Sequence, residues 1–85
     1  MKYIINNSIE MFVESCYTTG GGTTGAACVF PFIFRDKLRN SCTWDDAESE
    51  KPWCSIRVDE EGYHIGNKGL WGYCSSYCPV ESSKP

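Results

Sequence analysis

Six cysteines constrain the fold of this chain more than any other feature of its sequence. They are dispersed over 85 residues, at Cys16, Cys28, Cys42, Cys54, Cys74 and Cys78. An even number of dispersed cysteines is typical of a disulfide framework, and such frameworks persist in oxidising compartments because cytosolic thiols are kept reduced. A single core in a chain this short supplies only about 3–5 kcal/mol of stability, so cross-links are expected. We therefore expect one small, disulfide-stapled, extracellular domain.

A zinc site is the alternative interpretation of the same cysteines. Zinc sites made of thiolates use close pairs such as C-x-x-C, with histidines nearby. In this sequence only Cys74 and Cys78 are close to one another, and His64 is the single histidine. The spacing therefore favours disulfides, and we expect no metal and no cofactor.

Charge and hydropathy exclude two further classes of partner. The net charge of −3 leaves no basic surplus to follow phosphates, so we expect no nucleic-acid binding. No segment approaches the roughly 18 apolar residues of a membrane span.

The longest apolar run in residues 1–15 is three residues, whereas a signal peptide needs about 7–15. We interpret 1–15 as a native or added flanking arm, and the chain as an excised module or a mature form.

The remaining sequence predicts short strands separated by long polar loops. Residues 18–27, TTGGGTTGAA, predict a flexible loop because glycine allows almost any backbone angle. We expect two short antiparallel hairpins in a small, disulfide-rich, mostly β and loop domain. The first has a strand at 32–34 with a turn and return at 35–40, and the second pairs a strand from Trp53 to near Asp59 with one in 70–74. Loops are expected at 43–52 and 60–69.

The order of several short motifs resembles that of the fibronectin type II module. Cys28 is followed by FPFIF at 30–34, then by Cys42, by PWC at 52–54 and by WGYC at 71–74. The resemblance covers residues 25–74, and the interval from Cys54 to Cys74 is about five residues longer than in the usual module, by comparison with the family's spacing.

This resemblance implies a disulfide pattern that the cysteine count alone leaves open among many pairings. The family pairs its first cysteine with its third and its second with its fourth. That implies Cys28–Cys54 and Cys42–Cys74, and leaves Cys16 and Cys78 for each other, which is also the order found in the related kringle. An outer disulfide of this length should stabilise the fold by about 4 kcal/mol. The implied division is an arm at 1–15, a module at 16–78 and a tail at 79–85.

The resemblance also implies an aromatic pocket that is open to solvent. The positions that match its rim are Phe34, Trp53 and Trp71, with Tyr73 beside them and Tyr63 as a substitute in the lengthened loop. Arg39 stands where the family has a tyrosine, and it either donates to a ligand carbonyl or is solvated. The alternative is that both tryptophans merely fill a small core.

Alternation divides the phenylalanines between core and pocket. Phe30, Pro31 and Phe32 are interpreted as core and turn. Phe32 and Phe34 share one face of a strand, so we expect that they are not both wholly buried.

Two polar features of the segment 45–50 argue against a ligand contact there. The family's GR-x-D arginine is absent, and Asp46-Ala47-Glu48-Ser49 stands in its place. The acidic run Asp45, Asp46, Glu48 and Glu50 is interpreted as a solvated loop, since it lacks the D-x-D-x-D-G spacing of a calcium loop.

The predicted function is a non-catalytic binding module. An exposed aromatic cluster binds extended or proline-rich polypeptide, or it surrounds a quaternary ammonium group. We expect a monomeric module of a larger secreted protein that binds a collagen-like matrix polypeptide. The alternatives are a choline phospholipid head group, a docking module without a separate ligand, and, more remotely, a small secreted toxin or inhibitor. His64 has no recognisable nucleophile or orienting partner, so we expect no enzyme and no catalytic residue.

Overall fold

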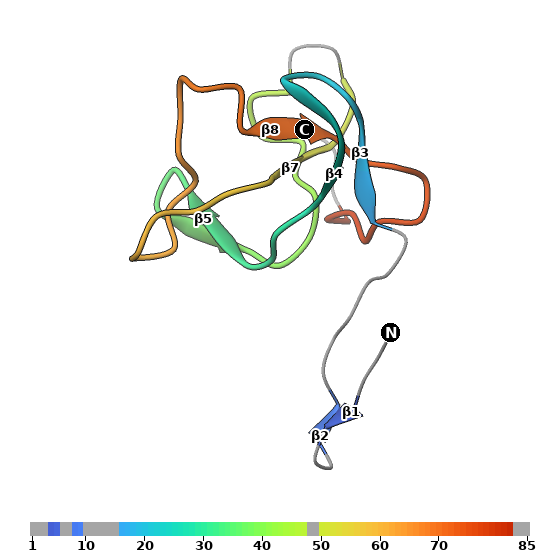
Figure 1. The fold of residues 1–85 in the computed structure, drawn as a ribbon, viewed down its shortest axis with the longest axis vertical. Helices are drawn as coiled ribbons and strands as arrows, with labels where there is room; N and C mark the ends of the chain where they lie inside the picture. The colour runs from blue at the N-terminus through green and yellow to red at the C-terminus, as the bar shows by residue number, and fades with distance from the viewer. Residues whose placement is uncertain (1–3, 6–7, 10–15, 48–49, 83–85) are drawn as a thin grey trace.

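The computed structural model describes residues 4–5, 8–9, 16–47 and 50–82, and its strands are all short (Figure 1). The strands are β1 (Ile4–Ile5), β2 (Ser8–Ile9), β3 (Tyr17–Gly20), β4 (Thr23–Ala27), β5 (Phe32–Phe34), β6 (Lys37–Arg39), β7 (Trp53–Ser55) and β8 (Trp71–Tyr73). They form four antiparallel pairs, β1–β2, β3–β4, β5–β6 and β7–β8. Most of the predicted arm at 1–15 lies outside the described residues. The predicted fold class is confirmed.

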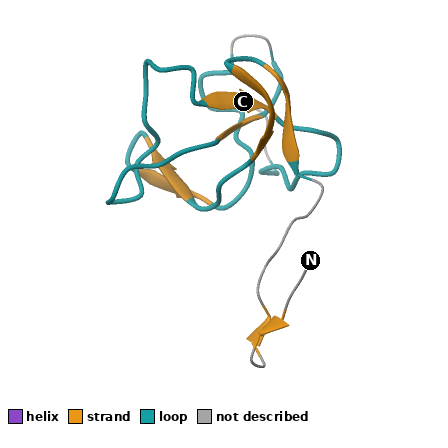
Figure 2. Cartoon of the chain, viewed as in Figure 1, coloured by secondary structure: helices purple, strands orange, loops and turns teal. Residues whose placement is uncertain are grey.

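The segment predicted as a flexible loop at 18–27 is a hairpin, so that prediction was wrong (Figure 2). Gly20 pairs with Thr23, and a two-residue turn lies between them in which Gly21 has a φ of 90°. The glycines therefore concentrate at the turn, where a left-handed residue is needed, and the β-branched threonines occupy the strands. The glycines of this segment indicate a tight hairpin turn and not a flexible loop.

The β5–β6 hairpin follows the prediction closely. Phe34 pairs with Lys37, and the two turn residues Arg35 and Asp36 both have positive φ, 53° and 62°. Two left-handed residues between paired strands form the turn whose twist matches that of a hairpin. Phe32 is fully buried and Phe34 is partly exposed, as the alternation argument predicted.

The β7–β8 pair connects segments that are far apart in the sequence. The predicted strand at 53–59 is shorter than expected, because β7 ends at Ser55. The Ser55 Oγ accepts a hydrogen bond of 3.2 Å from the Arg57 backbone N–H, and it lies 2.8 Å from the Arg57 carbonyl oxygen. A serine that bonds to the backbone two residues ahead turns the chain away from strand pairing.

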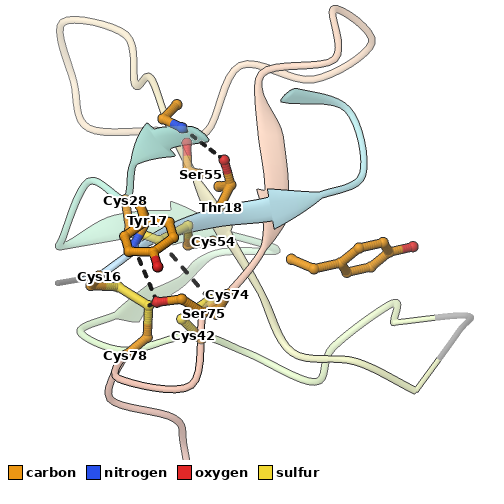
Figure 3. The surroundings of a disulfide bond; sticks show 12 residues. Cys16, Tyr17, Thr18, Cys28, Cys42, Cys54, Ser55, Cys74, Ser75 and Cys78 are labelled. Atoms are coloured by element: carbon orange, nitrogen blue, oxygen red, sulfur yellow. Dashed lines mark hydrogen bonds between the residues drawn. A yellow bond between two sulfur atoms is a disulfide. The ribbon is translucent and has the colours of Figure 1, made fainter. Parts of the chain in front are cut away.

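Three disulfides cross the centre of the module, and the predicted pairing is confirmed. The bonds are Cys16–Cys78, Cys28–Cys54 and Cys42–Cys74, which leave no free thiol among the described residues. The inner two lie against one another, with Cys28 Sγ 4.0 Å from Cys74 Sγ. The outer bond fixes β3 beside the segment after β8, where Ser75 N–H donates to the Tyr17 carbonyl at 2.9 Å (Figure 3).

The core is small and contains polar side chains. Its buried apolar members are Phe32, Trp53 and the cysteines Cys16, Cys42, Cys54 and Cys78, and its buried polar members are Thr18, Arg39, Thr43, Ser55 and Ser75. Residues after the last cysteine also pack on it. Cys42 N–H donates to the Pro79 carbonyl at 2.9 Å, and Glu81 N–H donates to the Cys42 carbonyl at 3.0 Å. Among the described residues there is no helix that is long and apolar enough to cross a membrane.

Candidate ligand-binding pocket

Side chains from three strands meet around one cavity of about 410 Å³. Phe34 comes from β5, Trp53 from β7, and Trp71 and Tyr73 from β8. The rest of the lining comes from the two loops on either side of β7, and consists of Asp46, Ala47, His64, Gly66 and Asn67. The structure thus brings together four of the six residues that the sequence nominated.

The aromatic rings form a continuous row of edge-to-face contacts. Ring centroids are 4.9 Å apart for Phe34 and Trp53, 6.4 Å for Trp53 and Trp71, and 5.0 Å for Trp71 and Tyr73. The interplanar angles lie between 83° and 89°. Rings packed by their edges in this way have stable geometry and leave parts of their faces available to a ligand.

The two tryptophans of the pocket differ in burial. Trp53 is 6% exposed and belongs to the core, and its Nε1–H donates to the Asp45 carbonyl at 2.7 Å. Trp71 is only partly buried. The alternative that the tryptophans fill the core is therefore true of Trp53 in part. Trp53 also lines the pocket, and so does the more exposed Trp71.

The turn of the β3–β4 hairpin lies directly against the Trp71 indole. A Cβ atom built on Gly21 would lie 2.6 Å from the Trp71 ring, and one on Gly22 would lie 2.7 Å from Trp71 Nε1. A further Cβ on Gly72 would lie 2.5 Å from the Thr18 side chain. Only glycine permits such an approach of backbone to ring, so the hairpin holds one side of the pocket wall.

Arg39 lies behind the pocket and not in its lining. Its side chain is 9% exposed, and its guanidinium donates to the Phe34 carbonyl at 2.9 Å and to Asp45 Oδ2 at 2.8 Å. It also donates to Thr43 Oγ1 at 3.2 Å. The expectation that Arg39 is solvated or donates to a ligand carbonyl does not agree with this position, because the side chain is buried and both of its terminal nitrogens already donate within the chain.

The acidic loop is more structured than the sequence indicated. Asp45 pairs with both Arg39 and Arg35, at 2.8 and 3.1 Å, and of the acidic residues that the structure describes in this loop, Asp46 is the one that lines the pocket. Asp46 is 54% exposed and lies 3.7 Å from Arg35. Glu48 lies outside the described residues. Asp45 is thus a structural partner of Arg39, and Asp46 a charged group on the pocket lining.

The lengthened loop contributes His64 and not Tyr63 to the pocket. The Tyr63 side chain is 40% exposed and is not among the lining residues, whereas His64 packs 5.2 Å from the Trp53 ring. His64 Nδ1 lies 2.7 Å from the buried Ser55 Oγ, and desolvation by burial lowers the pKa of His64 below 6.5. Successive side chains in extended backbone point to opposite sides. Tyr63 and His64 are neighbours, so the expectation that Tyr63 faces the pocket excluded His64, which is the residue that lines it.

Comparison with known proteins identifies the architecture. The sequence profile of the fibronectin type II domain matches residues 28–74. The chain belongs to the fibronectin type II family. This match spans both inner disulfides and every aromatic residue of the pocket, and leaves the β3–β4 hairpin outside it.

Two relatives of this fibronectin type II chain are a collagenase and a matrix metalloproteinase. It is 40% identical over 57 residues to the 72 kDa type IV collagenase of Gallus gallus, and 36% identical over 61 residues to matrix metalloproteinase-9 of Canis lupus familiaris. The matches cover 67% and 72% of the chain but only 8% of either relative. No solved structure matches the chain.

Proposed function

We propose that this fibronectin type II domain is a non-catalytic, extracellular binding module that holds an extended, collagen-like polypeptide in its aromatic pocket. The observation that carries the proposal is the row of four rings, Phe34, Trp53, Trp71 and Tyr73, around one cavity. The three disulfides support a secreted location, because such cross-links persist in oxidising surroundings.

An extended polypeptide suits this pocket for physical reasons. A proline-rich segment is already ordered as a polyproline II helix, so it loses little entropy when it binds. Flat aromatic side chains contact its rings with little loss of their own freedom. One relative is a type IV collagenase, which supports collagen as the class of ligand. The relatives' catalytic activity belongs to proteins of which this region is 8%, so it is not proposed here.

A choline head group is the second candidate, and the ring faces favour it. Aromatic faces attract a quaternary ammonium group by about 0.5–2 kcal/mol each. A docking role without a separate ligand is the third candidate, and it predicts that neither class of ligand changes the pocket.

Titration of the tryptophan indole N–H signals by NMR tests these candidates. Trp53 and Trp71 line the pocket and Trp44 does not, so the Trp44 signal is an internal control. Triple-helical and single-stranded collagen-like peptides, and separately phosphorylcholine, are added to the oxidised protein. We expect the Trp71 signal to move and saturate with the peptide. Movement with phosphorylcholine alone would select the second candidate, and no movement with either would refute the proposal.

A gelatin column provides the functional measurement. The substitution Trp71→Ala should abolish retention, whereas Tyr77→Ala should not, because Tyr77 is 73% exposed and lies outside the pocket lining. Near-ultraviolet circular dichroism and disulfide mapping check that both variants fold. If Trp71→Ala fails to fold, Trp71→Leu keeps an apolar side chain at this position and removes the ring. Full retention of that variant would contradict the proposal.

A further inference from the structure

The polar groups that line the aromatic pocket include donors, such as the Asn67 amide, and two acceptors, on Asp46 and His64. Among the described residues, Asp46 is the charged side chain in the lining, and it is acceptor-only when ionised. His64 is the one imidazole in the lining, and the proton on its ring decides whether it donates or accepts.

The partners of Ser55 determine which nitrogen of His64 carries that proton. The Ser55 hydroxyl has a single hydrogen, and a carbonyl oxygen lies 2.8 Å away on Arg57. Because a carbonyl only accepts, the hydroxyl donates to it. The 2.7 Å contact between Ser55 Oγ and His64 Nδ1 then needs a hydrogen from the imidazole. His64 is therefore the Nδ1–H tautomer when neutral.

This tautomer leaves a lone pair on Nε2, at the opposite side of the ring from Ser55. Ser55 is fully buried, so Nδ1 points into the core. Nε2 has no hydrogen-bond partner among the described residues and is not one of their buried unpartnered atoms. Since His64 lines the pocket, its free acceptor is available at the pocket side.

One cation of the described chain, Arg35, already lies at this side of the pocket, 5.4 Å from the centre of the Phe34 ring. Arg35 lies 3.7 Å from Asp46, but both side chains are more than half exposed, at 59% and 54%. Such surface pairs contribute little and exchange readily. Lys51 lies 5.4 Å from the Tyr73 ring and is exposed, and the Arg39 guanidinium is retained behind Phe34 by Asp45.

We propose that the pocket selects a polypeptide that carries a basic side chain, lysine or arginine, whose cationic group lies among the rings and donates to the acceptors of His64 and Asp46. Rings attract a cation through their faces, a carboxylate adds charge complementarity, and the neutral imidazole adds an acceptor. This inference rests on the proposed function, because it names the class of side chain that the same pocket accepts. Proline, which has no N–H donor, leaves the two acceptors unused.

Two matched peptides test the inference. Acetyl-Gly-Pro-Lys-Pro-Gly-amide and its norleucine counterpart share an apolar shaft and differ in the terminal ammonium group. Each is titrated against the wild-type protein at pH 7.5, with the Trp71 indole signal as readout. We expect the lysine peptide to bind about 3- to 10-fold more tightly. Equal affinity would overturn the inference and leave the proposed function standing, whereas binding of neither peptide would refute both.

A pair of aspartate substitutions separates the Asp46 contact from a general effect of charge. Asp46→Asn and Asp36→Asn remove the same charge, and both residues have a positive φ, 64° and 62°, which asparagine tolerates. Asp36 lies on the β5–β6 turn, outside the pocket lining. Asp46→Asn should reduce the preference for lysine over norleucine several-fold, and Asp36→Asn should leave it unchanged. An equal loss of this preference in both variants would show that it depends on the overall charge of the domain, which would refute the role of Asp46.

The substitution His64→Phe tests the imidazole acceptor. Phenylalanine keeps a flat ring in the lining and removes Nε2. We expect weaker binding of the lysine peptide with little change for the norleucine peptide. An equal change in both affinities would show that His64 contributes only its ring, which would contradict its role as acceptor.

Discussion

The guanidinium of Arg39 donates a hydrogen bond of 2.9 Å to the backbone carbonyl of Phe34, and lies 5.8 Å from the centre of the Phe34 ring. A buried cation on β6 is thereby connected to an aromatic wall of the pocket on β5. The same guanidinium is paired with Asp45 at 2.8 Å and lies 3.8 Å from Glu81, so two neighbouring segments and one that is 42 residues away meet at one side chain.

Replacement of Arg39 should destabilise the fold. Arg39→Met removes the charge and leaves two carboxylates, Asp45 and Glu81, without their buried partner. Breaking a fully buried ion pair costs about 3–5 kcal/mol, and we expect roughly 2–4 kcal/mol because the carboxylates are 29% and 31% exposed. Urea unfolding of the oxidised protein measures the difference in the free energy of unfolding.

Arg35→Met is the matched control for that experiment. Arg35 pairs with the same Asp45, at 3.1 Å, but its side chain is 59% exposed. Exposed pairs contribute about 0–1 kcal/mol, so this variant should unfold close to wild type. A similar loss from both arginines would show that burial is not the deciding factor.

The hairpin turn that lies against Trp71 predicts a steric effect. In Gly22→Ala the new Cβ would lie 2.7 Å from both Trp71 Nε1 and the Gly69 carbonyl oxygen, so the turn and the indole must separate. We expect a large change in the Trp71 indole signal and weaker peptide binding. Gly20→Ala, in the same hairpin, would meet only an ordinary contact of 3.5 Å with Tyr73 and should change little. An unchanged Trp71 signal in Gly22→Ala would show that the hairpin does not position this ring.

Removal of the outer disulfide should reduce stability without loss of the inner fold. Cys16 and Cys78 are 62 residues apart, and a loop of this length corresponds to about 4 kcal/mol in the chain-entropy description. The double variant Cys16→Ala with Cys78→Ala should melt at a lower temperature. Non-reducing peptide mapping should still recover Cys28–Cys54 and Cys42–Cys74. Scrambled pairs would show that the outer bond is required for the correct inner pairing.

The single histidine predicts a dependence of stability on pH. Burial lowers the pKa of His64 in the folded protein below 6.5, so the unfolded chain binds a proton first as the pH falls. The contribution of the neutral, buried His64 to the free energy of unfolding is fully present above pH 6.5. It is lost as the pH drops from 6.5 through the pKa of His64 in the folded protein. The difference in unfolding free energy between wild type and His64→Phe should therefore shift against wild type between pH 7.5 and pH 5.

NMR of the imidazole checks the same prediction directly. The carbon-bound protons of His64 should titrate with a midpoint below 6.5, and the nitrogen shifts of the neutral ring should place the hydrogen on Nδ1. A midpoint at or above 6.5 would contradict the prediction that burial disfavours the charged imidazole.

The cysteine spacing and the aromatic motifs predicted most of the fold. Disulfide order, the β5–β6 hairpin and the strand at 71–73 all follow from residues that are close in sequence or belong to a family pattern. The β3–β4 hairpin does not follow from composition, because four glycines among threonines are typical both of a flexible loop and of a tight turn between two β-branched strands.

The pocket residues on strands were predicted and those on loops were missed. The resemblance to the family nominated Phe34, Trp53, Trp71 and Tyr73, and strand alternation supported the placing of Phe34. The choice of His64 over Tyr63 depends on the register of a lengthened loop against Ser55. The burial of Arg39 depends on Asp45 and on Glu81, a residue 42 positions away that no local pattern connects to it.

The Cα atoms of Cys16 and Cys78 lie 4.5 Å apart across the outer disulfide. Residue 16, where β3 is about to begin, therefore lies beside residue 78, and the chain continues past residue 78 to Glu81, which is hydrogen-bonded to Cys42. A mechanical force applied through the flanking segments at these two residues acts along the covalent sulfur–sulfur bond and bypasses the hairpins. With that bond intact, tension along the chain would leave the aromatic pocket unloaded, and reduction of it would direct the same tension into β3 and β8.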